Sequence, residues 1–240
     1  MAEMSRDEVL ARYRHLRAIS THHHTEAMNF FSRPALLEQA RHLGLAAGGT
    51  LAAESFDELT LAFDLAIHAA RPGHTRAVDR YAGAARLRPG SDEALVLEAM
   101  RRARFSLWRV ERRHGVVGLV VQDLLREDEV WMVDEALERS APEGMVAAMR
   151  LCTPETFAMT CGVIVPVDRE LLEEVIATVL PRVRGSPDRV ADDRRFATAI
   201  YRAAVARGLM ARVGFEAAPP PARRAPARGP SAGPKWPKSS

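Results

Sequence analysis

The sequence predicts an α+β fold in which helices come first, five strands follow and further helices close the chain. In the first hundred residues, and again after residue 168, apolar side chains recur every three to four positions, as on one face of a helix. Between residues 105 and 165, short β-rich runs alternate with turn residues. Because helices and strands are segregated along the chain, this order favours α+β over repeated βαβ units with a parallel sheet.

The N-terminal helical region, residues 1–104, contains start and stop signals for helices. Ser5 and Glu8 form a capping box, and the apolar spacing after them predicts a long first helix that ends near Phe30. Gly44 ends a second helix, and a second capping box begins the third at Ser55. The five predicted helices span residues 5–30, 34–43, 55–70, 77–87 and 91–103.

Residues 105–167 predict a five-stranded antiparallel barrel-like unit. Open apolar edges promote aggregation, so the strands should curl into a small barrel or be covered by helices. The last two strands are separated by three residues, which predicts a hairpin in which Cys152 and Cys161 face opposite sides. Neither a disulfide nor a shared metal is then expected. The predicted strands span residues 105–112, 116–123, 129–135, 145–152 and 156–165.

Residues 168–218 predict a C-terminal helical pair that packs back on the same domain. Asp168 caps the first helix, and Ser186 with Pro187 opens the second, which ends at Gly208. The connections on both sides of the strand unit are short, so we expect helices and strands to form one continuous domain.

Residues 219–240 predict a disordered, basic tail. This segment holds seven of the 15 prolines and five basic residues with no acidic one, and it lacks the apolar residues needed for a core. The candidate contact residues of the tail are Arg223, Arg224, Arg228, Lys235 and Trp236.

The basic residues are almost all arginine, since the lysines are Lys235 and Lys238 in the tail. This pattern excludes P-loop nucleotide hydrolases, protein kinases and Schiff-base enzymes, which need a lysine on a folded element. Without the tail the formal charge is −2, so nucleic acid is expected to bind only through the tail. No signal peptide and no apolar stretch of about 18 residues is present, which predicts a cytoplasmic protein without a membrane span.

Three consecutive histidines near residue 23 suggest a metal site. His22 and Glu26 lie one helical turn apart, and with His24 they form the candidate ligand set. Consecutive helical residues point about 100° apart, so the set needs a further ligand such as His15, His68 or a carboxylate. The alternative is an ordinary helix surface with His23 on the semi-buried stripe.

The strand region offers a second candidate surface. Seven carboxylates lie within residues 123–138 and could bind a hard cation, or they are solvated turn acids. Two tryptophans on neighbouring strands could form a stacking platform, or they pack in the core. The candidate binding surface consists of Trp108, Trp131, Asp123 and Glu127.

The stretch from Phe105 to Val165 combines an apolar strand, a glycine turn, the V-x-D-L strand end at Val121 to Leu124, a charged loop and the P-x-G turn that ends at Gly144. It resembles a small β module of uncharacterised bacterial proteins, some of which carry a SEC-C zinc-binding tail. This chain lacks that cysteine-rich tail. The resemblance therefore implies a compact β module within a helical frame and transfers no catalytic residue.

Together these observations favour a non-catalytic protein-binding or regulatory module with an unknown protein partner. We predict no catalytic residue and no cofactor. One alternative is a metal-dependent hydrolase that uses the His22–His24 cluster with carboxylates of residues 123–138. The other is nucleic-acid association through the tail.

Overall fold

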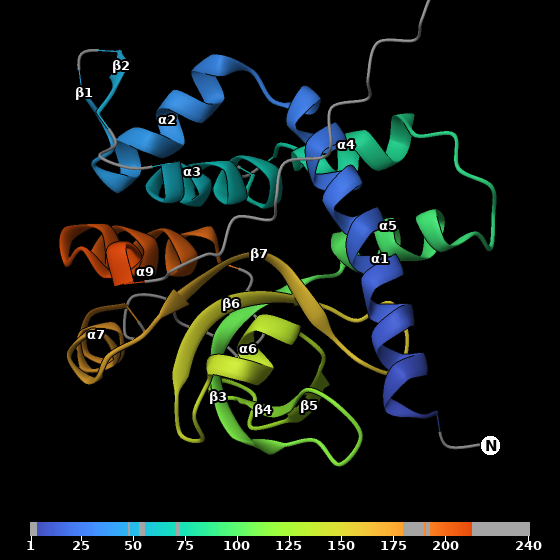
Figure 1. The fold of residues 1–240 in the computed structure, drawn as a ribbon. Coiled ribbons are helices and arrows are strands. Elements are labelled where there is room, and N and C mark those ends of the chain that lie inside the picture. The colour runs from blue at the N-terminus through green and yellow to red at the C-terminus, as the bar shows by residue number, and fades with distance from the viewer. Residues whose placement is uncertain are drawn as a thin grey trace, which may run out of the picture.

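The computed structural model describes residues 4–47, 49–52, 56–70, 73–179, 190 and 193–212. It confirms the α+β prediction, because helices pack around one five-stranded antiparallel sheet (Figure 1). None of the described helices has the length and apolar character that crossing a membrane requires.

The N-terminal helices begin where their capping residues predict. The Ser5 backbone N–H donates to Glu8 Oε2 at 2.8 Å, and the Ser32 and Ser91 side chains accept from backbone N–H groups three residues later. Ser55, the predicted cap of the third helix, lies outside the described residues. The helices are α1 (Arg6–Ala27), η1 (Met28–Phe30), α2 (Arg33–Leu43), α3 (Phe56–His68), α4 (Ala77–Ala84) and α5 (Asp92–Arg101). The short strands β1 (Ala46–Ala47) and β2 (Thr50–Leu51), which we did not predict, form a hairpin after α2.

The main sheet has the order β5-β4-β3-β6-β7 and is not closed into a barrel. An isolated parallel bridge joins Met132 of β5 to Ala158, the residue before β7, but the two edge strands do not pair, so the barrel prediction is wrong. Helices α1 and α3 contact β7 instead, which is the other way to protect an exposed edge. The strands are β3 (Arg104–Arg113), β4 (Leu119–Asp123), β5 (Glu129–Met132), β6 (Val146–Cys152) and β7 (Met159–Pro166).

The register of the last hairpin also differs from the prediction. Cys152 pairs with Met159, so the connection has six residues instead of three, and Phe157 is buried without being part of the strand. Cys161 then lies on the same face as Cys152, and both thiols are free. The alternating apolar residues before Met159 are explained by burial of the connection between the two strands, and they do not belong to a paired strand.

Asp134 begins α6 (Glu135–Ser140), a helix that we did not predict and whose first residue was expected to end the third strand. The Asp134 side chain accepts hydrogen bonds from the backbone N–H groups of Ala136 and Leu137.

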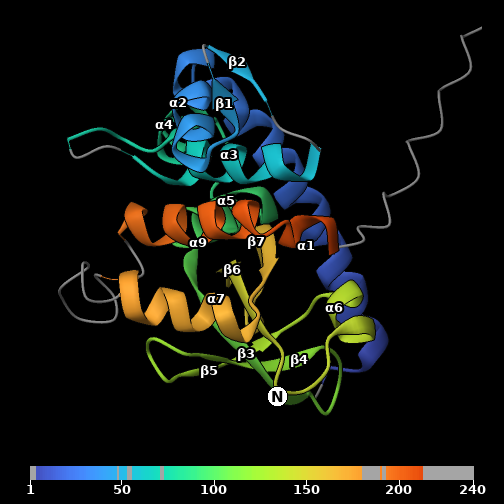
Figure 2. The same ribbon diagram turned by 90° about the vertical axis from the view of Figure 1, so that its left-hand side faces the viewer.

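The C-terminal helices return to the first half of the chain. Asp168 caps α7 (Arg169–Glu174), a π-helical segment η2 (Val175–Val179) follows, and Asp193 caps α9 (Arg194–Ala206), which leads to η4 (Leu209–Arg212). Ser186 and Pro187, the predicted start of the last helix, lie outside the described residues. Figure 2 shows α9 between α3 and α7, and α9 contacts both.

A large apolar core lies where α3 and α9 meet the sheet. The Phe105 ring from β3 packs edge-on against Phe196 and Tyr201, with ring centroids 5.8 and 5.4 Å apart. All three rings are at most 2% exposed, so this contact attaches the C-terminal helix firmly to the sheet.

A surface ion-pair group joins α1, α5 and the β6–β7 connection. Arg12 pairs with Asp92 at 2.6 Å and with Glu155 at 2.5 Å. The Arg12 guanidinium lowers the pKa of Asp92 from 3.8 to about 2. A carboxylate with a depressed pKa stabilises the fold above its unfolded pKa, and this stabilisation is lost as the pH falls from about 4 towards 2.

Replacing Arg12 with Gln should return the pKa of Asp92 towards 3.8, which an NMR titration of the side-chain carboxyl carbon measures. Asp79, whose partners are Arg76 and Arg101, is the control and should keep its lowered pKa. An Asp92 pKa that stays near 2 in the variant would show that Arg12 is not the cause.

Candidate functional site

A buried ionic network joins three elements that are far apart in the sequence. Asp64 on α3 accepts hydrogen bonds from Arg150 Nη2 on β6 at 3.1 Å and from the Tyr201 hydroxyl on α9 at 2.9 Å. The Asp64 side chain is 1% exposed and that of Arg150 is 9% exposed. Burial lowers the pKa of Arg150, but Asp64, Tyr201 and Cys161 together outweigh this effect and raise it. The guanidinium therefore stays charged in the interior, where the Asp64 carboxyl group is its ion-pair partner.

Gly162 on β7 allows the backbone to approach this network closely. Its φ of 136° lies in the region that favours glycine, and a Cβ atom at this position would overlap Asp64 Oδ1. A side chain at this position would therefore push against a carboxylate that three hydrogen bonds from Arg150 and Tyr201 already hold.

Beside the network, His24 on α1, His68 on α3 and Cys161 on β7 form a compact group. One ring nitrogen or sulfur atom from each lies within 4.8 Å of the other two. His24 Nε2 is 3.9 Å from Cys161 Sγ, and the two imidazole rings have centroids 5.8 Å apart. His68 is 5% exposed and Cys161 is completely buried.

The surroundings set the protonation of this group. Burial, reinforced by the nearby charge of Arg150, lowers the pKa of His68 well below its ordinary value. The neighbouring Cys152 thiol and burial raise the pKa of Cys161 well above its ordinary value. Without a bound ion, His68 is therefore a neutral imidazole and Cys161 a protonated thiol.

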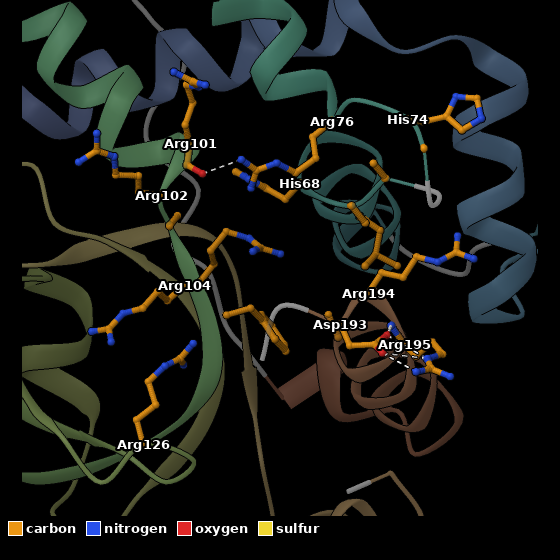
Figure 3. Close-up of a pocket in the computed structure, with 18 residues that line it drawn as sticks. His68, His74, Arg76, Arg101, Arg102, Arg104, Arg126, Asp193, Arg194 and Arg195 are labelled. Carbon is orange, nitrogen blue, oxygen red and sulfur yellow. Dashed lines mark hydrogen bonds and ion pairs between the residues drawn. The ribbon is translucent and has the colours of Figure 1, made fainter. Parts of the chain in front are cut away.

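His68 also lines an open cavity of about 990 Å³ that is rich in arginine. Figure 3 shows the lining side chains arranged around it from α5, β3, the β4–β5 turn and the start of α9. Eight arginines and one carboxylate, that of Asp193, line this arginine cavity. The arginines are Arg76, Arg101, Arg102, Arg104, Arg126, Arg150, Arg194 and Arg195.

Carboxylates that do not line the arginine cavity hold most of these side chains in place. The pairs are Arg76 and Arg101 with Asp79, Arg101 and Arg102 with Glu98, Arg104 with Asp128, Arg126 with Asp123, and Arg150 with Asp64. Together with Asp193, these acids still leave two positive charges in excess among the described groups. The lining of the arginine cavity therefore carries a net positive charge, and ion pairs hold most of its guanidinium groups in position.

Asp123 shows how such a positioning group is built. It is fully buried, so it is not a solvated turn acid, and its Oδ1 accepts from the backbone N–H groups of Leu125 and Arg126. Its Oδ2 lies 3.0 Å from Arg126 Nη1, which directs that guanidinium to the cavity. Glu127 completes the turn in a left-handed conformation, with φ of 63°.

The predicted metal ligands are only partly brought together. His24 faces His68 and Cys161, whereas His22 is exposed and Glu26 is half-buried on the same helix. Among the described residues, the group of three potential ligands contains neither His22 nor Glu26. His23 is buried, with its Nδ1 2.8 Å from the Tyr81 hydroxyl.

The carboxylates of residues 123–138 make structural contacts. Glu129, Glu135 and Glu138 pair with Arg112, Arg14 and Arg6 at 2.8 to 2.9 Å. Asp134 caps α6 and accepts a hydrogen bond from the Thr160 hydroxyl. None of these acids shares a three-ligand group with His24 among the described residues.

The predicted binding surface is divided between core and exterior. Trp108 is 1% exposed and donates its indole N–H to the Met149 carbonyl at 3.0 Å, so like Asp123 it is not accessible to a partner. Trp131 is half-buried and stacks on His114 with ring centroids 4.1 Å apart, and Glu127 is exposed. A partner surface at Trp131 and Glu127 stays a prediction. The tail residues Arg223, Arg224, Arg228, Lys235 and Trp236 lie outside the described residues.

Sequence reasoning missed the arginine cavity although local signals exist. Arg101, Arg102 and Arg104 lie within four residues at a helix-to-strand boundary, and Arg194 with Arg195 begins a helix. The net charge of a whole segment conceals such clusters, because acidic residues elsewhere in the segment cancel them.

Fold and site together define an α+β protein in which helices and an open antiparallel sheet surround an arginine-lined cavity beside a buried His–His–Cys group. The chain belongs to the family of unknown function DUF7986, whose model matches residues 7–212. No curated protein and no solved structure matches the chain significantly. The resemblance of residues 105–165 to the β module of SEC-C-bearing proteins stays a prediction.

Proposed function

We propose that this chain is a non-catalytic binding module whose ligand is a small phosphorylated compound, held in the arginine cavity. The observation that carries this proposal is the convergence of eight arginines on one cavity. A guanidinium has five N–H donors, and a carboxylate partner uses only one or two of them. The remaining donors favour phosphate oxygens, for which arginine is well suited because its planar fork binds them in pairs.

The start of α9 supports an anionic ligand independently. Backbone N–H groups at a helix N-terminus carry partial positive charge, so cationic side chains there are unfavourable by about 0.3–1 kcal/mol each. Arg194 and Arg195 occupy the first turn of α9 and both line the arginine cavity. Asp193 caps this terminus and pairs with Arg195, and a bound anion would add a second negative group that interacts with Arg194 and with the helix terminus.

The dimensions of the cavity favour a small ligand. Its volume of about 990 Å³ lies at the upper end of the usual range for small-molecule sites, which is about 300–1,000 Å³. Such a space accommodates a compound with several phosphate groups, such as a nucleoside triphosphate.

Arg102 provides the test, because its side chain is 78% exposed and its loss should not disturb folding. Binding of ATP and of tripolyphosphate is measured by isothermal titration calorimetry. Replacing Arg102 with Gln should weaken binding about tenfold, or ~1.4 kcal/mol, since one charge-assisted contact is lost. The wild-type affinity should also fall as salt is added.

The matched control is Arg169→Gln, which removes an exposed arginine with an i,i+4 glutamate partner on α7, outside the cavity. It should bind as the wild type does. Equal weakening by both substitutions, or no binding of either compound, would contradict the proposal.

A doubly phosphorylated peptide distinguishes a protein partner from a free compound. If the peptide binds more tightly than ATP and loses affinity in Arg102→Gln, the phosphate belongs to a protein, as the predicted protein-binding role requires. Steady hydrolysis of ATP by the purified chain would contradict a non-catalytic role and favour the hydrolase alternative.

A further inference from the structure

His24, His68 and Cys161 are three potential metal ligands that α1, α3 and β7 bring together in the interior. We infer that these three side chains bind a zinc ion, with a fourth position left for water or another small ligand. This site differs from the arginine cavity in chemistry and goes beyond the function proposed above.

The geometry is compatible with zinc after small side-chain shifts. Typical Zn–N and Zn–S bonds of about 2.1 and 2.3 Å at tetrahedral angles place ligand atoms about 3.4–3.6 Å apart. In the structure His24 Nε2 and Cys161 Sγ are 3.9 Å apart, and the three ligand atoms lie within 4.8 Å of one another. Side-chain shifts of a few tenths of an ångström up to about an ångström would complete the site. Two imidazoles and a thiolate are ligands of the softness that zinc accepts.

His68 supplies the second, independent observation. Both of its ring nitrogens are buried and neither has a hydrogen-bond partner among the described groups. A buried polar atom without a partner destabilises the fold, and such atoms are rare in folded proteins. A coordinated ion would satisfy one of these nitrogens.

His24 has the orientation of a metal ligand. Its Nδ1 lies 2.9 Å from the Ser20 carbonyl oxygen, which only accepts hydrogen bonds, so Nδ1 carries the proton. The lone pair of Nε2 is then directed towards Cys161. Metal-binding histidines usually donate their second N–H to such a carbonyl or to a carboxylate, which fixes the ring.

Binding is a simple exchange of a proton for an ion. The Cys161 thiol releases its proton to solvent as the sulfur–zinc bond forms, and each imidazole binds through a ring nitrogen that carries no proton. At least one proton is therefore released for each ion bound, and no electrons are transferred.

Cobalt(II) is the probe, because a thiolate bound to cobalt produces a charge-transfer absorption band in the near ultraviolet. The full chain is freed of metal with a chelator and titrated with cobalt(II), and then with zinc. We expect the band to saturate at one cobalt per chain and to disappear when one equivalent of zinc is added. Absence of the band, or no uptake of zinc by the metal-free chain, would overturn the proposal.

Cys161→Ala and His68→Gln should each weaken zinc binding at least about 100-fold, because each removes a direct ligand. His22→Gln is the matched control on the same helix as His24, and it should retain full binding. Circular dichroism and a thermal midpoint without metal establish that each variant folds. Loss of binding in His22→Gln, or retention in folded Cys161→Ala, would contradict the assignment. Neither readout depends on phosphate binding, so the two proposals fail separately.

Discussion

The Asp64→Asn variant should lose about 3–5 kcal/mol of its free energy of unfolding, because it leaves the Arg150 guanidinium in the interior without a compensating charge. Asparagine keeps the shape of aspartate, and its amide oxygen still accepts a hydrogen bond from the Tyr201 hydroxyl. The expected loss of stability therefore comes from removing the negative charge and not from a change in side-chain volume. Urea unfolding followed by circular dichroism measures it.

Two further variants separate charge compensation from general damage. Glu173→Gln breaks an ion pair whose side chains are 88% and 62% exposed, and it should change stability by less than about 0.5 kcal/mol. Arg150→Met added to Asp64→Asn removes the uncompensated charge and should restore part of the lost stability. If the double variant is no more stable than Asp64→Asn, an unpaired guanidinium is not the cause of the loss.

Gly162→Ala should cost about 2–4 kcal/mol in the same measurement, because one methyl group introduces two penalties. The backbone φ of 136° is strained for any residue with a side chain, and the new Cβ atom overlaps Asp64 Oδ1. The carboxylate cannot move away easily, because Arg150 and Tyr201 both donate hydrogen bonds to it.

The two penalties of Gly162→Ala can be told apart in a second background. In Asp64→Ala chains the overlap is absent, so Gly162→Ala should cost only the backbone strain, at least ~1 kcal/mol less than in the wild type. Gly83→Ala, at a helical glycine whose added Cβ would meet no atom within 4 Å, is the control and should be neutral or stabilising. If Gly162→Ala lowers the free energy of unfolding equally in the wild type and in Asp64→Ala, the overlap with Asp64 contributes nothing and the loss comes from backbone strain.

Elements with local signals were the ones that could be predicted from sequence. The caps at Ser5, Ser91 and Asp168 each accept a backbone hydrogen bond three residues later, so the information lies within one helical turn. The start of α6 was not predicted, because the apolar run before Asp134 continues the pattern of a strand. The barrel prediction failed because pairing of β5 with β7 depends on how helices cover the sheet edges. The spacing of apolar residues along the sequence carries no information about this.

The candidate site could not be predicted for a related reason. Asp64 and Arg150 are separated by 86 residues, and Cys161 meets His24 across 137. The sequence pattern identified His24 and considered His68, but it placed Cys161 on the face opposite to Cys152, because the hairpin connection was assumed to be too short. One error of register was enough to hide the third member of the group.

The hydrogen bond from Tyr201 to Asp64 has a consequence for folding during synthesis on the ribosome. A chain that has emerged from the ribosome only as far as β7 already contains Asp64, Arg150 and Phe105, but it lacks the helix that covers them. Until α9 arrives, an ion pair and an aromatic ring that are buried in the finished protein face water, and loop closure over such distances is slow. The nascent protein therefore reaches its final packing only after α9 has been translated, and an arrested chain that ends before residue 194 should be an easy target for proteases.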